Sequence, residues 1–191
     1  MNPAELIARI TTQTKSFQLT AKDFIRLTPE DVAHAMGKIH KRKELKHASL
    51  VLRVKYADQK ELMRDLEIAL WLAVVDMSNR NHWKYPKNRI GKEFYRKMAR
   101  LAISENVNPQ ICPKCKGTNI RKLRDGKTTD CGPCDGTGHK SNSERERARF
   151  LGLSHMVFIY TWSERYKDIV AMLVGWETCG LGALKKGLKT H

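Results

Sequence analysis

Apolar residues recur every three or four positions over the longest patterned stretch of the chain, residues 58–81. This is the spacing of one face of an α-helix. Acidic Asp58 and Glu61 open the stretch, and Asn79-Arg80-Asn81 closes it. The stripe that we expect to be buried consists of Leu62, Leu66, Ala69, Leu70 and Ala73, widened by Trp71, Val74 and Val75. The sequence therefore predicts a central core helix here.

Three further stretches show helical spacing, and together they predict a mainly α fold. One follows Thr28-Pro29, where a threonine cap and a proline at the first helical position mark a helix start. The others are residues 91–103 and 163–176. In chain order, the apolar positions of the three stretches are Val32, Ala35, Met36 and Ile39; then Phe94, Met98, Leu101 and Ala102; and then Tyr166, Ile169, Val170 and Leu173. Residues 48–57 fit a helix or a strand, and the glycines and lysines of 179–191 predict a loose tail.

The excess of basic over acidic residues indicates what class of partner the protein binds. The 191 residues carry 36 Lys and Arg against 20 Asp and Glu, a formal net charge of +16. Such a surplus favours a polyanion, with nucleic acid preferred over a membrane. The basic cluster within residues 38–60 fits a solvated face or a nucleic-acid contact equally well. The longest apolar run, residues 69–75, is too short to span a bilayer, and no signal peptide is recognisable. We expect a cytoplasmic protein without a membrane partner.

Four cysteines form the most specific motif of the chain. Cys112 and Cys115, then Cys131 and Cys134, give the spacing C-x2-C-x15-C-x2-C, which is typical of a four-cysteine zinc site. Each pair can supply two corners of a tetrahedral shell, and a shell closed by four thiolates predicts a structural rather than a catalytic Zn²⁺. Disulfides are the alternative, and a reducing cytosol disfavours them. The residues expected to stand outside the site are His139 and Cys179.

A helix-turn-helix pattern follows the cysteines. Ser143-Glu144-Arg145-Glu146 is a capping box that starts a helix, and Gly152 stands where the turn requires a left-handed conformation. Small Ala148 would lie where the helices cross, and Ser154 would cap the second helix. The apolar residues expected between the helices are Leu151, Leu153 and Phe158. An ordinary helical hairpin is the alternative.

In this register the N-terminal end of the second helix would enter the major groove of DNA. Besides Ser154, the residues expected at base edges are His155, Met156, Val157, Tyr160 and Thr161. The basic side chains expected to hold phosphates are Arg145, Arg147, Arg149, Arg165 and Lys167. Trp83 and Tyr85, set among basic residues, fit either base stacking or the edge of the core, and we favour the core edge.

Two motifs carry a family resemblance over roughly residues 60–176. They are the knuckles Cys112-x-x-Cys115-x-Gly117 and Cys131-x-x-Cys134-x-Gly136-x-Gly138, and the segment Thr161-Trp162-Ser163 with Tyr166 and Asp168 after it. Their order resembles the late-gene antitermination protein Q family of lambdoid bacteriophages. The first knuckle departs from the pattern at Asn119, where a second glycine is expected.

The resemblance implies a non-enzymatic, zinc-containing protein that binds double-stranded DNA at a phage late promoter. It would join bacterial RNA polymerase while the sigma factor is still attached, contact nascent RNA, and make the enzyme read through terminators. The sequence itself holds no phosphate-binding loop or nucleophile motif that would indicate an enzyme. Two alternatives remain: a zinc-containing DNA-binding repressor or activator without antitermination activity, and a zinc-stabilised RNA-binding or chaperone-like adaptor.

This interpretation divides the chain into five segments. They are an N-terminal helical and basic region (1–57), a helical core (58–108), a zinc module (109–140), a helix-turn-helix with its packing helix (141–178) and a flexible tail (179–191).

Overall fold

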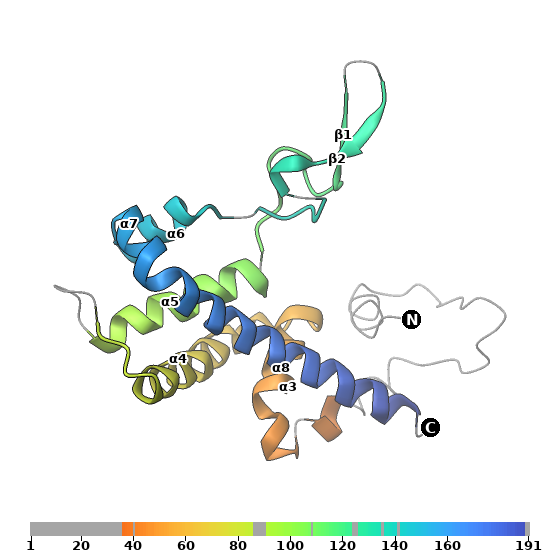
Figure 1. The fold of residues 1–191 in the computed structure, drawn as a ribbon. Helices are drawn as coiled ribbons and strands as arrows, with labels where there is room; N and C mark the ends of the chain where they lie inside the picture. Colours follow the sequence, from red (N-terminus) through yellow and green to blue (C-terminus); the bar gives the residue numbers. More distant parts are fainter. Residues whose placement is uncertain are drawn as a thin grey trace. The chain divides into compact units, whose positions relative to one another are not determined.

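The computed structural model describes residues 36–39, 41–85, 91–107, 109–123, 126–134, 136–140 and 142–189, and these are mainly helical (Figure 1). The helix start expected at Thr28 lies outside the described residues. The chain divides into two compact units, one of residues 1–69 and 172–191 and the other of residues 70–171. None of the described helices has the length and apolar character that crossing a membrane requires.

The first unit is built around α3 (Lys46–Tyr56), with a short 3-10 helix on either side of it (Lys43–Leu45 and Lys60–Leu62). The stretch that fitted a helix or a strand is therefore helical. The C-terminal part of α8 (Ser163–Lys189) belongs to the same unit. Its buried cluster consists of Ile39, Leu45, Ala48, Leu52 and Leu184.

The segment after Cys179, expected to be a loose tail, continues α8 as far as Lys189. Leu184 is fully buried there against α3. A Cβ added at Gly180 would lie only 2.9 Å from Leu52 Cδ1, so the glycine lets the two helices approach closely. Gly180, one of the glycines that predicted a loose segment, thus lies at a close helix contact.

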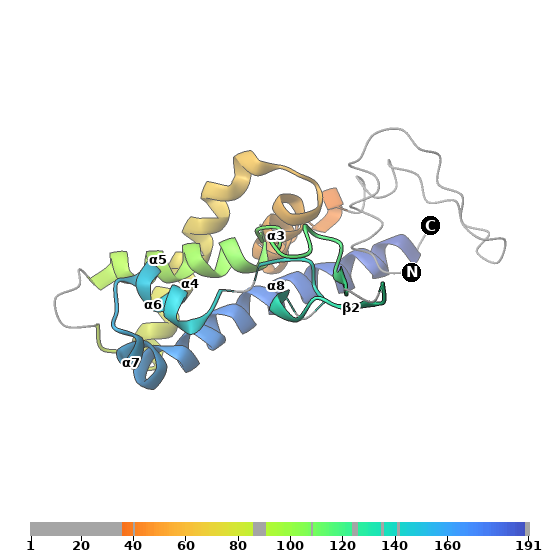
Figure 2. The same cartoon turned by 90° about the horizontal axis from the view of Figure 1, so that it is seen from above.

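The second unit holds the remaining elements. Its helices are the C-terminal part of α4 (Met63–Arg80), α5 (Gly91–Asn106), α6 (Glu144–Leu151), α7 (His155–Val157) and the start of α8. A hairpin of β1 (Ile120–Lys122) and β2 (Thr128–Asp130) follows α5 in the chain. α6 and α7 pack against each other at the N-terminal end of α8 (Figures 1 and 2).

The amphipathic stripe read from the sequence is confirmed for α5 and only in part for α4. α4 ends at Arg80 as expected and buries Leu66, Leu70 and Val74 completely. Ala69 and Ala73 are only half-buried, so the stripe follows the i, i+4 line through the leucines. On α5 the expected inward positions are all buried: Phe94, Met98, Leu101 and Ala102.

Aromatic side chains fill the middle of the second unit. Trp162 is 1% exposed, and its ring meets that of Phe94 edge-on, with 4.6 Å between the centroids. Trp83 is half-buried and packs on both Trp162 and Tyr95. Trp83 therefore lies at the edge of the core, as expected.

Candidate metal centre and helix-turn-helix

The four paired cysteines converge into one buried cluster. Their Sγ atoms all lie within 4.8 Å of one another, and each residue is at most 6% exposed. Sγ of Cys112 is 4.0 Å from that of Cys131, and Sγ of Cys115 is 3.7 Å from that of Cys134. Both separations far exceed the roughly 2.05 Å of a disulfide bond, and all four thiols are free. The cluster is a candidate site for a single metal ion.

The first residue of each cysteine knuckle is hydrogen-bonded to the last residue of the other knuckle. The backbone N–H of Cys112 donates to the carbonyl of Gly138, and the N–H of Cys131 donates to the carbonyl of Asn119, both at 2.9 Å. Asn119 and Gly138 stand at equivalent places, four residues after the second cysteine of each pair. The two knuckles are therefore related by an approximate twofold repeat, which brings all four sulfurs to one point.

The same repeat extends to the turns behind the sulfurs. The hydroxyls of Thr118 and Thr137 donate to the carbonyls of Cys115 and Cys134 respectively, both at 2.7 Å. The residue before each threonine is a glycine in the left-handed region, with φ of 85° and 70°. These are the glycines that the motif places two residues after each pair, and their conformation is one that other side chains adopt at a cost.

Backbone and burial act in opposite directions on the thiols. Hydrogen bonds from the backbone N–H groups of Cys115 and Lys114 lower the pKa of the Cys112 thiol to about 7. Burial, followed by hydrogen bonds with the neighbouring sulfurs, raises the pKa of the Cys131 thiol to about 12. Metal ligands bind as thiolates, so a bound cation would favour the deprotonated form of the cluster.

His139 and Cys179 stand apart from the four sulfurs, as expected. His139 forms an isolated antiparallel bridge with Ile111 and is exposed. Cys179 is an exposed residue within α8. Between the two knuckles, β1 pairs with β2 in the register Ile120↔Asp130 and Lys122↔Thr128, and every residue of β2 is exposed.

The first helix of the expected helix-turn-helix begins and ends where the sequence predicts. Ser143 and Glu146 form the capping box: Ser143 Oγ accepts from the Glu146 N–H, and Glu146 Oε2 accepts from the Ser143 N–H at 2.9 Å. Gly152 ends α6 in the left-handed conformation, with φ of 67°. The N–H of Leu153 then donates to the carbonyl of Ala148 at 2.8 Å, which closes a Schellman-type turn.

The second helix is capped as expected but does not end before Ser163. Ser154 Oγ accepts from the N–H of Val157 at 3.3 Å. α7 leads into a π-helix (Phe158–Trp162) and then into α8 with no non-helical residue between them. Ser163 itself has helical dihedral angles, φ of −60° and ψ of −50°. The separate last helix predicted over 163–176 is therefore the continuation of the helix that begins at His155.

The π-helix divides its residues sharply between core and solvent. Phe158 and Trp162 are fully buried, whereas Tyr160 is 79% exposed. Met156 and Val157 are also exposed, at 57% and 42%, as are Ser154 and Thr161; His155 is half-buried. The residues expected at base edges thus form a solvent-facing surface, which we call the α7 face and which consists of Ser154, His155, Met156, Val157, Tyr160 and Thr161.

Arg147, expected to hold a phosphate, instead binds Glu105. Its Nε donates to both carboxylate oxygens of Glu105, at 3.0 and 3.2 Å, and the Glu105 side chain is only 10% exposed. The hydroxyl of Tyr166 and the amide of Asn142 donate to the same carboxylate, each at 2.8 Å. Burial raises the pKa of Tyr166, and so does the carboxylate beside it. Glu105 therefore links α5 to α6 and α8, a role that the sequence did not reveal.

Two other expected phosphate contacts are also engaged. The Arg165 guanidinium lies over Trp162, with Cζ 4.7 Å from the ring centroid, and also lies near Trp83. Nζ of Lys167 is 2.6 Å from the exposed carboxylate of Glu164. Arg145 and Arg149 remain: both are exposed on α6, and neither pairs with an acidic side chain of the described part of the chain.

No protein-family model matches this sequence, and no curated protein does.

Proposed function

We propose that this protein is a zinc-containing, sequence-specific DNA-binding factor that acts in transcription antitermination on bacterial RNA polymerase at a phage late promoter. The observation that carries the DNA-binding proposal is the α7 face. It lies at the capped N-terminal end of a helix, directly after a glycine turn, and Met156, Tyr160 and Thr161 on it are exposed. The major groove of B-DNA admits a helix presented in this way.

Charge supports a duplex partner for this surface. The chain carries a net charge of +16. Arg145 and Arg149 are exposed on α6, which directly precedes the α7 face, and on this proposal they hold phosphates of the duplex. The α7 face itself carries few charges, so on this proposal phosphates supply most of the affinity and the face supplies the discrimination between sequences.

Zinc is the metal that we propose for the sulfur cluster. With Zn–S bonds of about 2.3 Å, the sulfurs of a regular tetrahedron lie about 3.8 Å apart. The separations of 4.0 Å between Cys112 and Cys131 and 3.7 Å between Cys115 and Cys134 agree with that value. Four thiolates would leave no open coordination position, so the proposed role of Zn²⁺ is to hold the two knuckles together.

The antitermination part of the proposal rests on the resemblance and on the pairing of the two modules. A simple repressor needs only the DNA-binding helix, usually with a surface for dimerisation. Here a hairpin that carries the exposed Arg121 stands between the knuckles, and on this proposal it contacts a second partner. RNA polymerase with its sigma factor is the partner that the resemblance supplies, and nascent RNA near the exit of the enzyme is a further one.

Two measurements on one template test the proposal. The first is binding of the purified protein to promoter DNA, compared with single-stranded RNA at matched salt. The second is transcription through a terminator downstream of the cognate late promoter, with and without the protein. Read-through that depends on promoter binding supports the proposal. Promoter binding that blocks initiation without read-through favours the repressor, and RNA binding without duplex binding favours the adaptor.

A further inference from the structure

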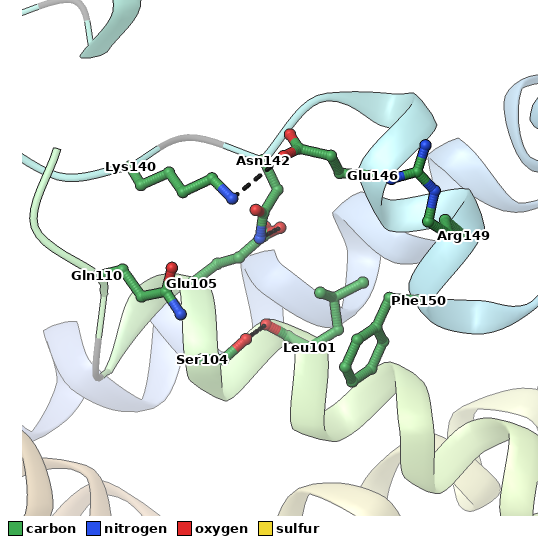
Figure 3. Close-up of a pocket in the computed structure, with 9 residues that line it drawn as sticks. All are labelled: Leu101, Ser104, Glu105, Gln110, Lys140, Asn142, Glu146, Arg149 and Phe150. Atoms are coloured by element: carbon green, nitrogen blue, oxygen red, sulfur yellow. Dashed lines mark hydrogen bonds and ion pairs between the residues drawn. The ribbon is translucent and has the colours of Figure 1, made fainter. Parts of the chain in front are cut away.

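A cavity of about 420 Å³ lies between α5 and α6 in the second unit (Figure 3). Leu101 and Ser104 of α5 line one side of it, and Arg149 and Phe150 of α6 line the other. Gln110, which follows α5, closes one end. Its volume is within the roughly 300–1,000 Å³ that is usual for small-ligand sites. The cavity is therefore large enough for a single nucleobase with its sugar.

An aromatic ring forms the apolar wall of this cavity. Phe150 is 51% exposed although it belongs to the last turn of α6, and its ring lies beside Leu101 of α5 (Figure 3). The core of the unit thus leaves about half of this large side chain uncovered. An exposed aromatic ring beside basic residues is the arrangement on which nucleobases stack in proteins that bind single strands.

Several polar groups at the cavity already have partners. Glu105 accepts from Arg147, Tyr166 and Asn142, while Glu146 serves the capping box and pairs with Lys140 at 3.1 Å. Two groups remain without a partner among the described residues: the amide of Gln110 and the guanidinium of Arg149. The cavity thus offers a ligand one aromatic surface, one group that can both donate and accept, and one cation.

We propose that this cavity binds one nucleotide of a single-stranded nucleic acid. The base stacks on Phe150, the amide of Gln110 hydrogen-bonds its edge, and Arg149 holds its phosphate. A base within a duplex is stacked on both faces and paired at its edge, so it cannot enter. The site contains no residue of the α7 face and does not depend on that face reading duplex DNA, although it shares Arg149 with the proposed phosphate contacts of the duplex. Single-stranded DNA and RNA both present the required groups.

The test compares Phe150→Ala with wild type and with Tyr160→Ala, which removes an exposed aromatic ring from the α7 face. Fluorescence anisotropy would measure binding to single-stranded DNA, single-stranded RNA and promoter duplex, the single strands of about 12 nucleotides. Phe150→Ala should weaken single-strand binding about tenfold, the loss typical of one stacking contact. Its salt dependence should not change, because no phosphate contact is removed. Duplex binding should stay at the wild-type level.

Two further variants separate stacking from a general loss of structure. Phe150→Trp keeps a stacking ring and should restore single-strand binding. Gln110→Ala alters an exposed residue outside the helices and should weaken single-strand binding without changing the melting temperature. A 2-aminopurine in the strand should lose fluorescence with wild type but not with Phe150→Ala. Whichever of the two strands, DNA or RNA, binds more tightly and shows the larger fluorescence loss is the nucleic acid that the cavity recognises.

The proposal is overturned if Phe150→Ala and Gln110→Ala bind both single strands as tightly as the wild-type protein does. It is also overturned if the wild-type protein binds neither strand. The cavity would then be free for another ligand, such as a segment of a protein partner. If the wild-type protein does not bind the promoter duplex, only the proposed recognition of duplex DNA is overturned. Tyr160→Ala should show the converse pattern, with weaker duplex binding and unchanged single-strand binding.

Discussion

The amide of Asn119 fills the space that a side chain at Gly138 would need. The two residues end the two knuckles, and both adopt the left-handed conformation, with φ of 67° and 75°. A Cβ at Gly138 would also lie 3.0 Å from the carbonyl oxygen of Gly117. Asparagine tolerates this conformation better than most residues. The departure of the first knuckle from the glycine pattern thus puts a side chain where the second knuckle has only a glycine hydrogen.

Replacing Gly138 by alanine should therefore weaken the metal site more than backbone strain alone would. Gly126 is the matched control, because it also has a positive φ, of 82°, but nothing lies within 4 Å of a Cβ added there. We expect Gly126→Ala to cost about 1 kcal/mol and Gly138→Ala about 2 kcal/mol or more. Thermal unfolding of the metal-loaded protein and zinc competition with a chromophoric chelator measure the difference. Equal effects of the two substitutions would show that the contact with Asn119 is unimportant.

One zinc ion should bind per chain. Elemental analysis of protein purified without chelator should give one equivalent, and Cys115→Ser should release it because a thiolate of the closed shell is lost. Cys179→Ser is the control: this thiol is exposed on α8 and separate from the four-sulfur cluster, so the variant should keep its zinc. Metal-free wild-type protein would disprove the zinc assignment.

The features that the sequence predicted correctly are those determined by neighbours in the chain. The cap at Ser143, the turn at Gly152 and the cysteine pairs each depend on residues within a few positions, and each is found where it was expected. Amphipathic helices belong to the same class, because a 3.6-residue period identifies the buried face without knowledge of what covers it.

Features that depend on distant partners were missed. In the sequence, Glu105 is an acidic residue on a basic helix with no indicated partner. Its partner is Arg147, which lies 42 positions later in the chain. Gly180 looks like a helix breaker until Leu52 is found 2.9 Å from the place of its missing Cβ. The π-helix that carries Tyr160 outward likewise depends on the burial of Phe158 and Trp162. In each case a tertiary contact overrides the local preference.

Glu105→Gln should destabilise the second unit by about 2–3 kcal/mol. The substitution keeps the shape of the side chain but leaves the half-buried Arg147 without its carboxylate. Chemical denaturation measures the loss. Glu164→Gln is the control, because its pair with Lys167 is largely exposed and should contribute nothing measurable. Similar unfolding midpoints for the two variants would mean that Glu105 does not anchor α6.

The capping box should be visible in an acid titration. A hydrogen bond from the backbone N–H of Ser143 and a second from Lys140 lower the pKa of Glu146 from 4.5 to about 2. A folded-state pKa below the unfolded one gives a contribution to stability that is complete above pH 4.5 and is lost as the pH falls towards 2. Carboxyl-carbon NMR should report the low pKa directly, and Lys140→Ala should raise it. Glu146→Gln should remove this pH dependence from acid unfolding, and a normal pKa for Glu146 would contradict the capping geometry.

The α7 face and α6 should contribute to DNA binding in different ways. Arg149→Ala should weaken binding to all sequences alike and reduce the salt slope by about 0.9, as expected for one phosphate contact. Tyr160→Ala or His155→Ala should instead change the preference between sites by about 1–3 kcal/mol per lost base contact. Gel-shift titrations on cognate and scrambled duplexes over a range of salt separate the two effects. If neither class of variant changes binding, the hairpin is structural.

The hairpin between the knuckles should matter for read-through and not for promoter binding. Arg121 lies on β1 and is exposed, and it belongs to the module between α5 and the helix-turn-helix rather than to the α7 face. If this module contacts polymerase or nascent RNA, Arg121→Glu should abolish terminator read-through while promoter affinity stays within a factor of about two. Lys186→Glu makes the same charge change on exposed α8 and should preserve both activities. Tyr160→Ala should reduce both, because a factor that binds the promoter more weakly joins the polymerase there less often. Read-through that survives Arg121→Glu but disappears with Tyr160→Ala would leave the zinc module with a structural role and move the polymerase contact elsewhere on the chain.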